Sequence, residues 1–380
     1  MSKTIRDMDW VLATCLLMLA LTGSVVPALQ DDPQILQKYA ALWAMGILGF
    51  TALCFVPLKV LERSSLPIYA AVLLLLAFTF ISTHLQHLPS RRWLDLGVIA
   101  LEPAKMMIWV LIIALAGWFA NREATGKRTV AAAFLLAALP AIIIFMQPDF
   151  GVFLAVVITS YIIIVAAGLS RKGVSLTLGG SAIIVTLLWQ LMHEYQRQRI
   201  TTLFVPEIDV HNLQLYVPFN LLYLSYEERS LPHAMNAEGL FNLGEISMEL
   251  VEHAILALNG NAGIIAVALL FIIYALLLQR ILSIRSKSRN RFAKMLATGI
   301  AALFTFTIVL NLLSSLSYFP THTLFTGLPF IGSDGGALFS MLAAMGVVMR
   351  IAIESNGKNE NVEDSSRPAE MLESSAGGIT

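Results

Sequence analysis

The sequence predicts an all-α, polytopic membrane protein with about ten transmembrane helices, and two observations support this fold class. Hydrophobic residues make up 57% of the 380 residues and charged residues only 13%, roughly half the charged fraction of a soluble domain. The apolar residues also gather in runs close to the ~20 residues that a helix needs to cross a bilayer. A soluble globular fold is therefore excluded.

Each apolar run is interpreted as one membrane-spanning helix. The first run lacks a small-residue cleavage site of the signal-peptide type and is expected to remain as an uncleaved helix. The eighth is long enough to hold a lead-in segment and the span itself. Residues 355–380 are rich in Ser, Glu, Asn and Gly, which predicts a disordered tail. The ten predicted spans cover approximately residues 10–29, 40–60, 67–84, 103–120, 129–146, 152–168, 174–192, 252–281, 293–316 and 335–353.

The distribution of Lys and Arg predicts the orientation of these helices, because cytoplasmic loops carry an excess of basic residues. A cytoplasmic N-terminus places most of the 25 basic residues on the cytoplasmic side, including the loop 280–294. We interpret that loop as an anchor against anionic lipid and expect no nucleic-acid partner. Both termini are then cytoplasmic. One transmembrane domain covers 1–354, with a large outer loop, about 193–248, between helices seven and eight.

The turn between the fifth and sixth runs, residues 147–151, has the sequence Gln-Pro-Asp-Phe-Gly. Its proline, carboxylate and glycine are unfavourable at a membrane boundary unless a site or a tight turn requires them. Asp149 is placed to cap the N-terminus of the sixth helix, and we favour that structural role over catalysis. The predicted structural motif residues are Gln147, Pro148, Asp149 and Gly151 in this turn, with Gly335 and Gly336 before the last span.

Three more short motifs fall on the same predicted outer side. Residues 91–97 read RRWLDLG, residues 195–200 read YQRQRI, and residues 326–331 read TGLPFI, followed by Gly335 and Gly336. Their order and spacing resemble the SEDS family (shape, elongation, division and sporulation), which includes RodA, FtsW and SpoVE. The resemblance covers almost the whole chain. It implies ten transmembrane helices, cytoplasmic termini and a large outer loop after the seventh helix, in agreement with the charge distribution.

This resemblance implies a peptidoglycan glycosyltransferase of the bacterial cytoplasmic (inner) membrane, acting in cell shape and elongation or in division. The implied substrate is lipid II, an undecaprenyl pyrophosphate-linked disaccharide pentapeptide, which is polymerised into glycan strands at the outer face. The implied partner is a class B penicillin-binding protein. Displacement of pyrophosphate by a sugar hydroxyl needs a base for the acceptor and cations for the leaving group.

The catalytic Asp of the family, matched through the similar segment 262–265, falls on Glu252. The longer side chain supports the same proton chemistry, but a misplacement of ~1 Å costs on the order of a hundredfold in rate. Glu245, Glu249 and Glu252 share one face if the segment is helical, and mutual repulsion would raise their pKa values towards neutrality. The same acids could instead bind a divalent cation such as Mg or form a solvated acidic face. No metal ligand is assigned.

Candidate substrate-binding cations lie at three outer positions. Arg197 and Arg199 are suited to bind pyrophosphate bidentately, and basic residues are otherwise disfavoured on the outer side. Arg92 adds a third guanidinium. Its neighbour Trp93 either stacks on a sugar or lies in the interfacial aromatic belt.

Two motifs depart from the family pattern. The family has Gln-Pro-Ser-Glu where this chain has Glu-Pro-Ala-Lys, and the spacing of Glu102 and Lys105 permits either a local ion pair or binding of the substrate's anionic groups. Asp334 replaces a tyrosine before Gly335 and Gly336, adding an acid to the outer mouth. These glycines either expose N–H groups to an anion or permit a tight turn. Glu249 and Asp334 complete the predicted substrate-binding set.

Two alternatives remain open. The long outer loop lacks the glycine-rich stretch that the family carries, and its catalytic acid is altered. Both departures are compatible with a catalytically weak or inactive scaffold for a class B penicillin-binding protein. A transporter of lipid-linked precursors is less favoured, because few acids or helix breaks lie deep within the predicted spans.

Overall fold

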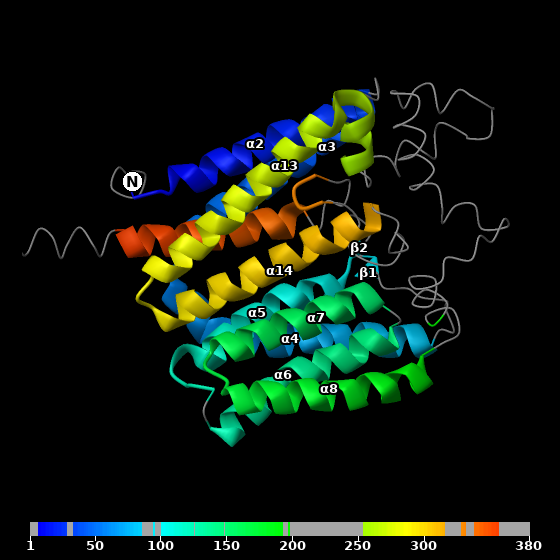
Figure 1. Ribbon diagram of the computed structural model, residues 1–380, viewed down its shortest axis with the longest axis vertical. Helices are drawn as coiled ribbons and strands as arrows, with labels where there is room; N and C mark the ends of the chain where they lie inside the picture. The colour runs from blue at the N-terminus through cyan, green and yellow to red at the C-terminus, as the bar shows by residue number, and fades with distance from the viewer. Residues whose placement is uncertain are drawn as a thin grey trace, which may run out of the picture.

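The computed structural model describes residues 7–28, 33–85, 94–95, 100–124, 126–147, 149–192, 197, 254–315, 328–331 and 338–356. Within these ranges, ten helices follow one another in the order of the ten predicted spans, and they run roughly parallel as one bundle (Figure 1). The predicted all-α polytopic fold is confirmed. The helices are α2 (Trp10–Ala28), α3 (Pro33–Phe55), α4 (Leu58–Leu85), α5 (Pro103–Ala120), α6 (Lys127–Met146), α7 (Phe150–Ala166), α8 (Arg171–Leu191), α13 (Ala254–Lys287), α14 (Arg291–Ser315) and the C-terminal helix (Leu338–Asn356).

Six of the described helices are long and apolar enough to cross a membrane, namely α4, α5, α6, α13, α14 and the C-terminal helix. Shorter apolar helices lie at Trp10–Gly23, Ala40–Phe55 and Gly151–Ala166. In α8 the first half alternates Leu and Val with Gly, Ser and Thr, which lowers its hydropathy. The protein is therefore a multi-pass membrane protein. The described strands, β1 (Leu94–Asp95) and β2 (Ala100–Leu101), form a short antiparallel pair before α5.

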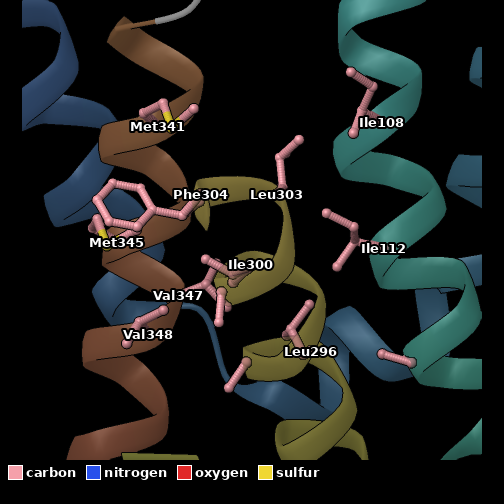
Figure 2. Close-up of a cluster of buried hydrophobic side chains, with 14 of the residues drawn as sticks. Ile108, Ile112, Leu296, Ile300, Leu303, Phe304, Met341, Met345, Val347 and Val348 are labelled. Atoms are coloured by element: carbon pink, nitrogen blue, oxygen red, sulfur yellow. The ribbon is translucent and has the colours of Figure 1, made fainter. Parts of the chain in front are cut away.

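The centre of the bundle is formed by α5, α14 and the C-terminal helix. Their spans are 67, 72 and 72% buried, whereas those of α4, α6 and α13 are each 28% buried. Figure 2 shows α14 between the other two central helices, with Leu303 on the side of Ile112 and Phe304 beside Met345 on the other side. The outer helices consequently present most of their apolar side chains to lipid.

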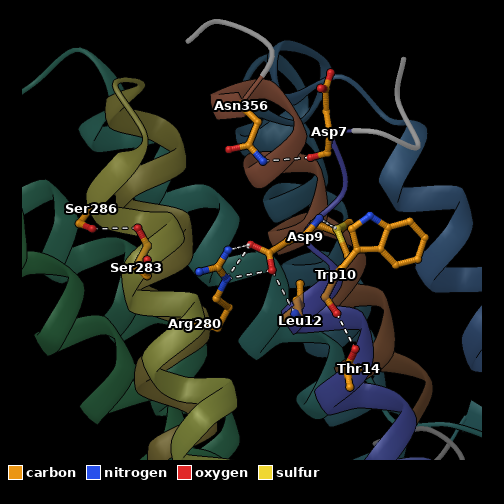
Figure 3. Close-up of polar contacts among 10 residues, drawn as sticks. Asp7, Asp9, Trp10, Leu12, Thr14, Arg280, Ser283, Ser286 and Asn356 are labelled. Carbon is orange, nitrogen blue, oxygen red and sulfur yellow. Dashed lines mark hydrogen bonds and ion pairs between the residues drawn. The ribbon is translucent and has the colours of Figure 1, made fainter. Parts of the chain in front are cut away.

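The N-terminal end of α2 is joined to α13 by an ion pair between Asp9 and Arg280, beside the C-terminal helix (Figure 3). The Nε of Arg280 lies 2.9 and 2.7 Å from the two carboxylate oxygens of Asp9, and its Nη2 lies 2.7 Å from Oδ2. The Asp9 side chain is only 2% exposed, and it also accepts a hydrogen bond from the Leu12 N–H. The pair therefore links the first helix to α13 in an apolar setting.

Both ends of the described chain lie at this same end of the bundle. The Asn356 side chain donates to the Asp7 carbonyl at 3.0 Å, and the Asp9 N–H contacts the sulfur of Met349 at 3.2 Å. The first and last helices also begin and end on the same side in Figure 1. This arrangement agrees with the prediction that both termini are on one side of the membrane.

Close packing between α3 and the C-terminal helix depends on glycine. A Cβ at Gly346 would overlap the carbonyl oxygen of Phe50 and lie 3.0 Å from that residue's C and Cα atoms. Because these are backbone atoms, they cannot move aside as a flexible side chain can. Gly46 and Gly49 of α3 approach the side chains of Leu342 and Phe339, so the two helices meet along a face of small residues.

Gly346→Ala is expected to lower the unfolding temperature measured in detergent, because overpacking a tight contact costs about 1–3 kcal/mol. Gly179→Ala in α8 is the matched control, since a Cβ there meets nothing within 4 Å. The control should melt like the wild type or slightly higher. Equal melting of both variants would show that the two helices do not approach as closely as described.

Candidate functional site

The described part of the chain contains five of the predicted site residues: Lys105, Gln147, Asp149, Gly151 and Arg197. Those outside the described residues are Arg92, Trp93, Pro148, Arg199, Glu249, Glu252, Asp334, Gly335 and Gly336. The roles of the latter set, including that of Glu252 as the base, stay predictions. Gln147, Asp149 and Gly151 lie together at the turn between α6 and α7, whereas Lys105 lies in the first turn of α5 and Arg197 follows α8.

The turn between α6 and α7 is built by backbone and side-chain caps. The Gln147 N–H donates to the carbonyls of Ile143 and Ile144 at 3.0 and 3.1 Å, which closes the end of α6. The carboxylate of Asp149 accepts a hydrogen bond from the Val152 N–H at 3.1 Å and caps α7. Asp149 is 4% exposed, and Gly151 is buried in the first turn of α7. The predicted capping role of Asp149 is thus confirmed.

Asp149→Ala is expected to destabilise the protein by about 1 kcal/mol, because loss of an N-cap leaves a helix N–H unsatisfied. Asp149→Asn should retain most of the stability, since asparagine caps equally well. Thermal unfolding of both variants in detergent measures the difference. Ser170→Ala, which removes the exposed N-cap of α8, is the matched control. A loss in the Asn variant as large as in the Ala variant would indicate a role for the charge itself.

Lys105 and Glu102 form the ion pair that their spacing allows, with Nζ 2.9 Å from Oε2. Glu102 directly precedes α5, and its side chain is 8% exposed, against 23% for Lys105. Because the carboxylate is nearly buried, the ammonium group offsets much of its desolvation. Any anionic group of a substrate would meet a cation whose charge Glu102 already balances in part.

The guanidinium of Arg197 caps the end of α8. Its Nε donates to the carbonyl of Trp189 at 3.1 Å, and its Nη2 donates to that of Gln190 at 3.0 Å. Basic side chains commonly satisfy the last carbonyls of a helix in this way. Pyrophosphate would therefore have to compete with these contacts, and the predicted clamp formed with Arg199 stays a prediction.

A feature that sequence reasoning missed lies in the TGLPFI motif. The Tyr274 hydroxyl of α13 donates to the carbonyl of Pro329 at 2.6 Å in a buried setting. The available signal was a tyrosine within an apolar run, because a buried phenol usually needs a polar partner. The partner itself, 55 residues away, could not be read from helical spacing.

The described residues contain no group of three His, Cys, Asp or Glu side chains placed to hold a metal ion. The acids considered for a divalent cation, Glu245, Glu249 and Glu252, lie outside the described ranges.

Comparisons with known proteins agree with this architecture. The curated peptidoglycan glycosyltransferase MrdB of Escherichia coli K12 is 23% identical over 333 residues, covering 84% of this chain and 86% of that protein. A probable peptidoglycan glycosyltransferase FtsW of Alkalilimnicola ehrlichii is 26% identical over 387 residues, covering 95% and 93%. These alignments cover more than four fifths of the chain and of each relative.

Solved structures show the same fold. A chain from a structure described as "Structural coordination of polymerization and crosslinking by a peptidoglycan synthase complex" superposes with a TM-score of 0.75 at 23% identity, covering 92% of this chain and 98% of that one. The crystal structure of the rod shape determining protein RodA from Thermus thermophilus gives a TM-score of 0.64 at 21% identity, covering 91% and 96%.

The family model described as cell cycle protein, for FtsW, RodA and SpoVE, matches residues 8–217 and 252–357. The unmatched residues, 218–251, overlap most of the predicted outer loop that lacks the glycine-rich sequence and extend slightly past its end, and the match resumes at Glu252. Since the matched segments make up most of the chain, this protein belongs to the FtsW/RodA/SpoVE family of cell cycle proteins.

Proposed function

We propose that this protein is a peptidoglycan glycosyltransferase that polymerises lipid II at the outer face of the bacterial cytoplasmic (inner) membrane. The observation that carries the proposal is the family match on both sides of the outer loop, together with the described ten-helix bundle. Relatives that carry the name peptidoglycan glycosyltransferase align over most of their length, which supports the same reaction here.

In the proposed reaction, Glu252 accepts the proton of the acceptor sugar hydroxyl while the new glycosidic bond forms and undecaprenyl pyrophosphate leaves. The helix α13 begins at Ala254, so the base would lie two residues before a long helix. The proposed cations for the leaving pyrophosphate, which gains negative charge as the bond breaks, are Arg92, Lys105, Arg197 and Arg199.

We propose a class B penicillin-binding protein as the partner that crosslinks the new strands. Support comes from the solved complex, whose description joins polymerization with crosslinking and whose matched chain shares the fold of this protein. Cell elongation and division both remain within the proposal, because the relatives include MrdB and FtsW.

A catalytically weak or inactive scaffold is the second candidate, and a specific observation favours keeping it. The catalytic position holds Glu252 in place of the Asp expected from the family, and the glycine-rich stretch is missing from the outer loop. A scaffold would use the same fold and partner without performing the glycosyl transfer.

The test is conversion of labelled lipid II by the purified protein in liposomes, with and without the cognate penicillin-binding protein. Parallel reactions contain Mg²⁺ or a chelator, and the products are separated by size on a gel. The proposal predicts glycan polymer that increases with the partner. Absence of polymer under every condition, while the partner still binds, would favour the scaffold.

A further inference from the structure

The chain between α14 and the C-terminal helix contains a turn that is buried within the bundle. The Ile331 N–H donates to the Leu328 carbonyl at 3.0 Å, and both of these side chains and that of Phe330 are at most 4% exposed. Residues 328–331 thus form a four-residue turn with proline at its second position. Irregular backbone at this depth is tolerated only where protein or a water-filled cavity surrounds it.

Aromatic contacts place the turn well below the outer end of α14. The ring of Phe330 packs on Phe304 with centroids 6.0 Å apart, and Phe304 packs edge-on against Tyr274 at 5.7 Å. Phe304 precedes the end of α14, Ser315, by eleven residues, or roughly 16 Å of helix. Phe271 extends the column by a further edge contact with Tyr274, at 6.3 Å.

The turn also holds a strained backbone. Phe330 has φ 68°, the only positive φ found among the non-glycine residues that the structure describes. Proline at the second position and positive φ at the third are typical of a type II turn, where glycine or asparagine is usual. A bulky residue in this conformation persists only when its surroundings hold it, and such strain gathers at functional sites.

Tyr274 supplies the polar contact that the buried turn requires. Its hydroxyl, on a side chain with 2% exposure, reaches the Pro329 carbonyl at 2.6 Å. A carbonyl at membrane depth is unfavourable without a donor, so the hydroxyl stabilises the turn while the ring packs beside it. The turn 328–331 is therefore buried, strained at Phe330 and held in place by the Tyr274 hydroxyl of α13.

We propose that Tyr274 is a positioning residue for the outer mouth of the bundle, acting through the turn 328–331. This inference rests on the proposed glycosyltransferase function. Asp334 follows Ile331 by three residues in the sequence. The hydrogen bond from Tyr274 to Pro329 therefore fixes the turn from which the chain continues to Asp334, Gly335 and Gly336.

The expected effect appears in substrate binding. Tyr274→Phe removes one hydroxyl and keeps the ring, so the aromatic column stays while the Pro329 carbonyl loses its donor. We expect KM for lipid II to rise about threefold to tenfold, the range that corresponds to one net hydrogen bond. The change in kcat should be smaller, because Tyr274 does not touch the reacting atoms.

Tyr69→Phe is the matched control. The Tyr69 hydroxyl of α4 donates to the Leu136 carbonyl of α6 at 2.7 Å, and Tyr69 is 5% exposed. The substitution Tyr69→Phe thus removes the same kind of hydrogen bond, from a tyrosine hydroxyl to a backbone carbonyl, between a different pair of helices. Thermal unfolding of both variants shows whether their stability losses are comparable, which separates a local positioning effect from a general weakening of the bundle.

Hydrogen exchange of the full-length protein in detergent gives a readout that does not depend on activity. Peptides covering 328–331 should exchange faster in Tyr274→Phe and stay unchanged in Tyr69→Phe. If exchange at 328–331 were unchanged in Tyr274→Phe, the positioning role would be overturned. It would also be overturned if exchange became faster while KM for lipid II stayed the same in an active enzyme. Faster exchange in a protein whose wild type makes no polymer would reject the glycosyltransferase function while supporting the role of Tyr274 in holding the turn.

Discussion

Glu252→Ala is expected to reduce the rate of glycan polymerisation by roughly 10²–10⁴-fold, the usual contribution of a general base. Without this carboxylate, the acceptor hydroxyl must lose its proton to water while the pyrophosphate departs. The measurement is the initial rate of polymer formation from labelled lipid II at equal amounts of folded protein. Its size makes this the largest functional effect expected of any single substitution in the chain.

Glu123→Ala is a suitable control, because Glu123 forms an ion pair with Arg291 and its side chain is 65% exposed. It should polymerise like the wild type. Glu252→Asp is expected to be slower than the wild type, since a site shaped for the longer side chain leaves the carboxylate about 1 Å short. If Glu252→Ala were fully active and Glu249→Ala were inactive, the general base would be Glu249 and not Glu252.

Asp9→Ala is expected to produce the largest loss of stability, about 2–4 kcal/mol. Removing one partner of a buried ion pair leaves an uncompensated charge, although the 29% exposure of the Arg280 side chain reduces the loss through solvent screening. The substitution also deletes the N-cap of α2. The unfolding temperature in detergent, measured by fluorescence, reports the difference.

Two further variants test whether the lost stability of Asp9→Ala comes from the broken ion pair. Asp9→Ala combined with Arg280→Met should recover part of the lost stability, because the stranded guanidinium is removed along with its partner. Glu123→Ala should change stability by less than about 1 kcal/mol, as is usual for an exposed ion pair. If Asp9→Ala were as stable as Glu123→Ala, the ion pair would not link α2 to α13 as described.

The helices themselves could be predicted from the sequence because membrane spans depend on local length and hydropathy. All ten predicted spans overlap described helices. Their bounds differ at several ends. The predicted span 40–60 crosses the break between α3, which ends at Phe55, and α4, which begins at Leu58, and α13 continues to Lys287 beyond the predicted end at 281. The sequence run alone does not show where an apolar helix extends past the bilayer.

The local parts of the site were also predictable. The cap by Asp149 and the pair formed by Glu102 and Lys105 join residues three apart, so helix geometry is sufficient to expect them.

Long-range contacts were not predictable from helical spacing. The bond from Tyr274 to Pro329 and the pair of Arg280 with Asp9 join residues 55 and 271 positions apart. Periodicity identifies which face of a helix is apolar, but it carries no information about which other helix covers that face. A polar side chain within an apolar run indicates that a partner is needed without identifying it.

The most direct test of the central claim uses wild-type protein with a penicillin-binding protein whose transpeptidase nucleophile has been replaced. Crosslinking is then absent, so any high-molecular-weight product from labelled lipid II must arise by glycosyl transfer. If the protein is a glycosyltransferase, we expect linear glycan strands that a muramidase digests to disaccharide units. Stable binding of the two proteins with lipid II left unconverted would contradict the claim and identify the protein as a scaffold.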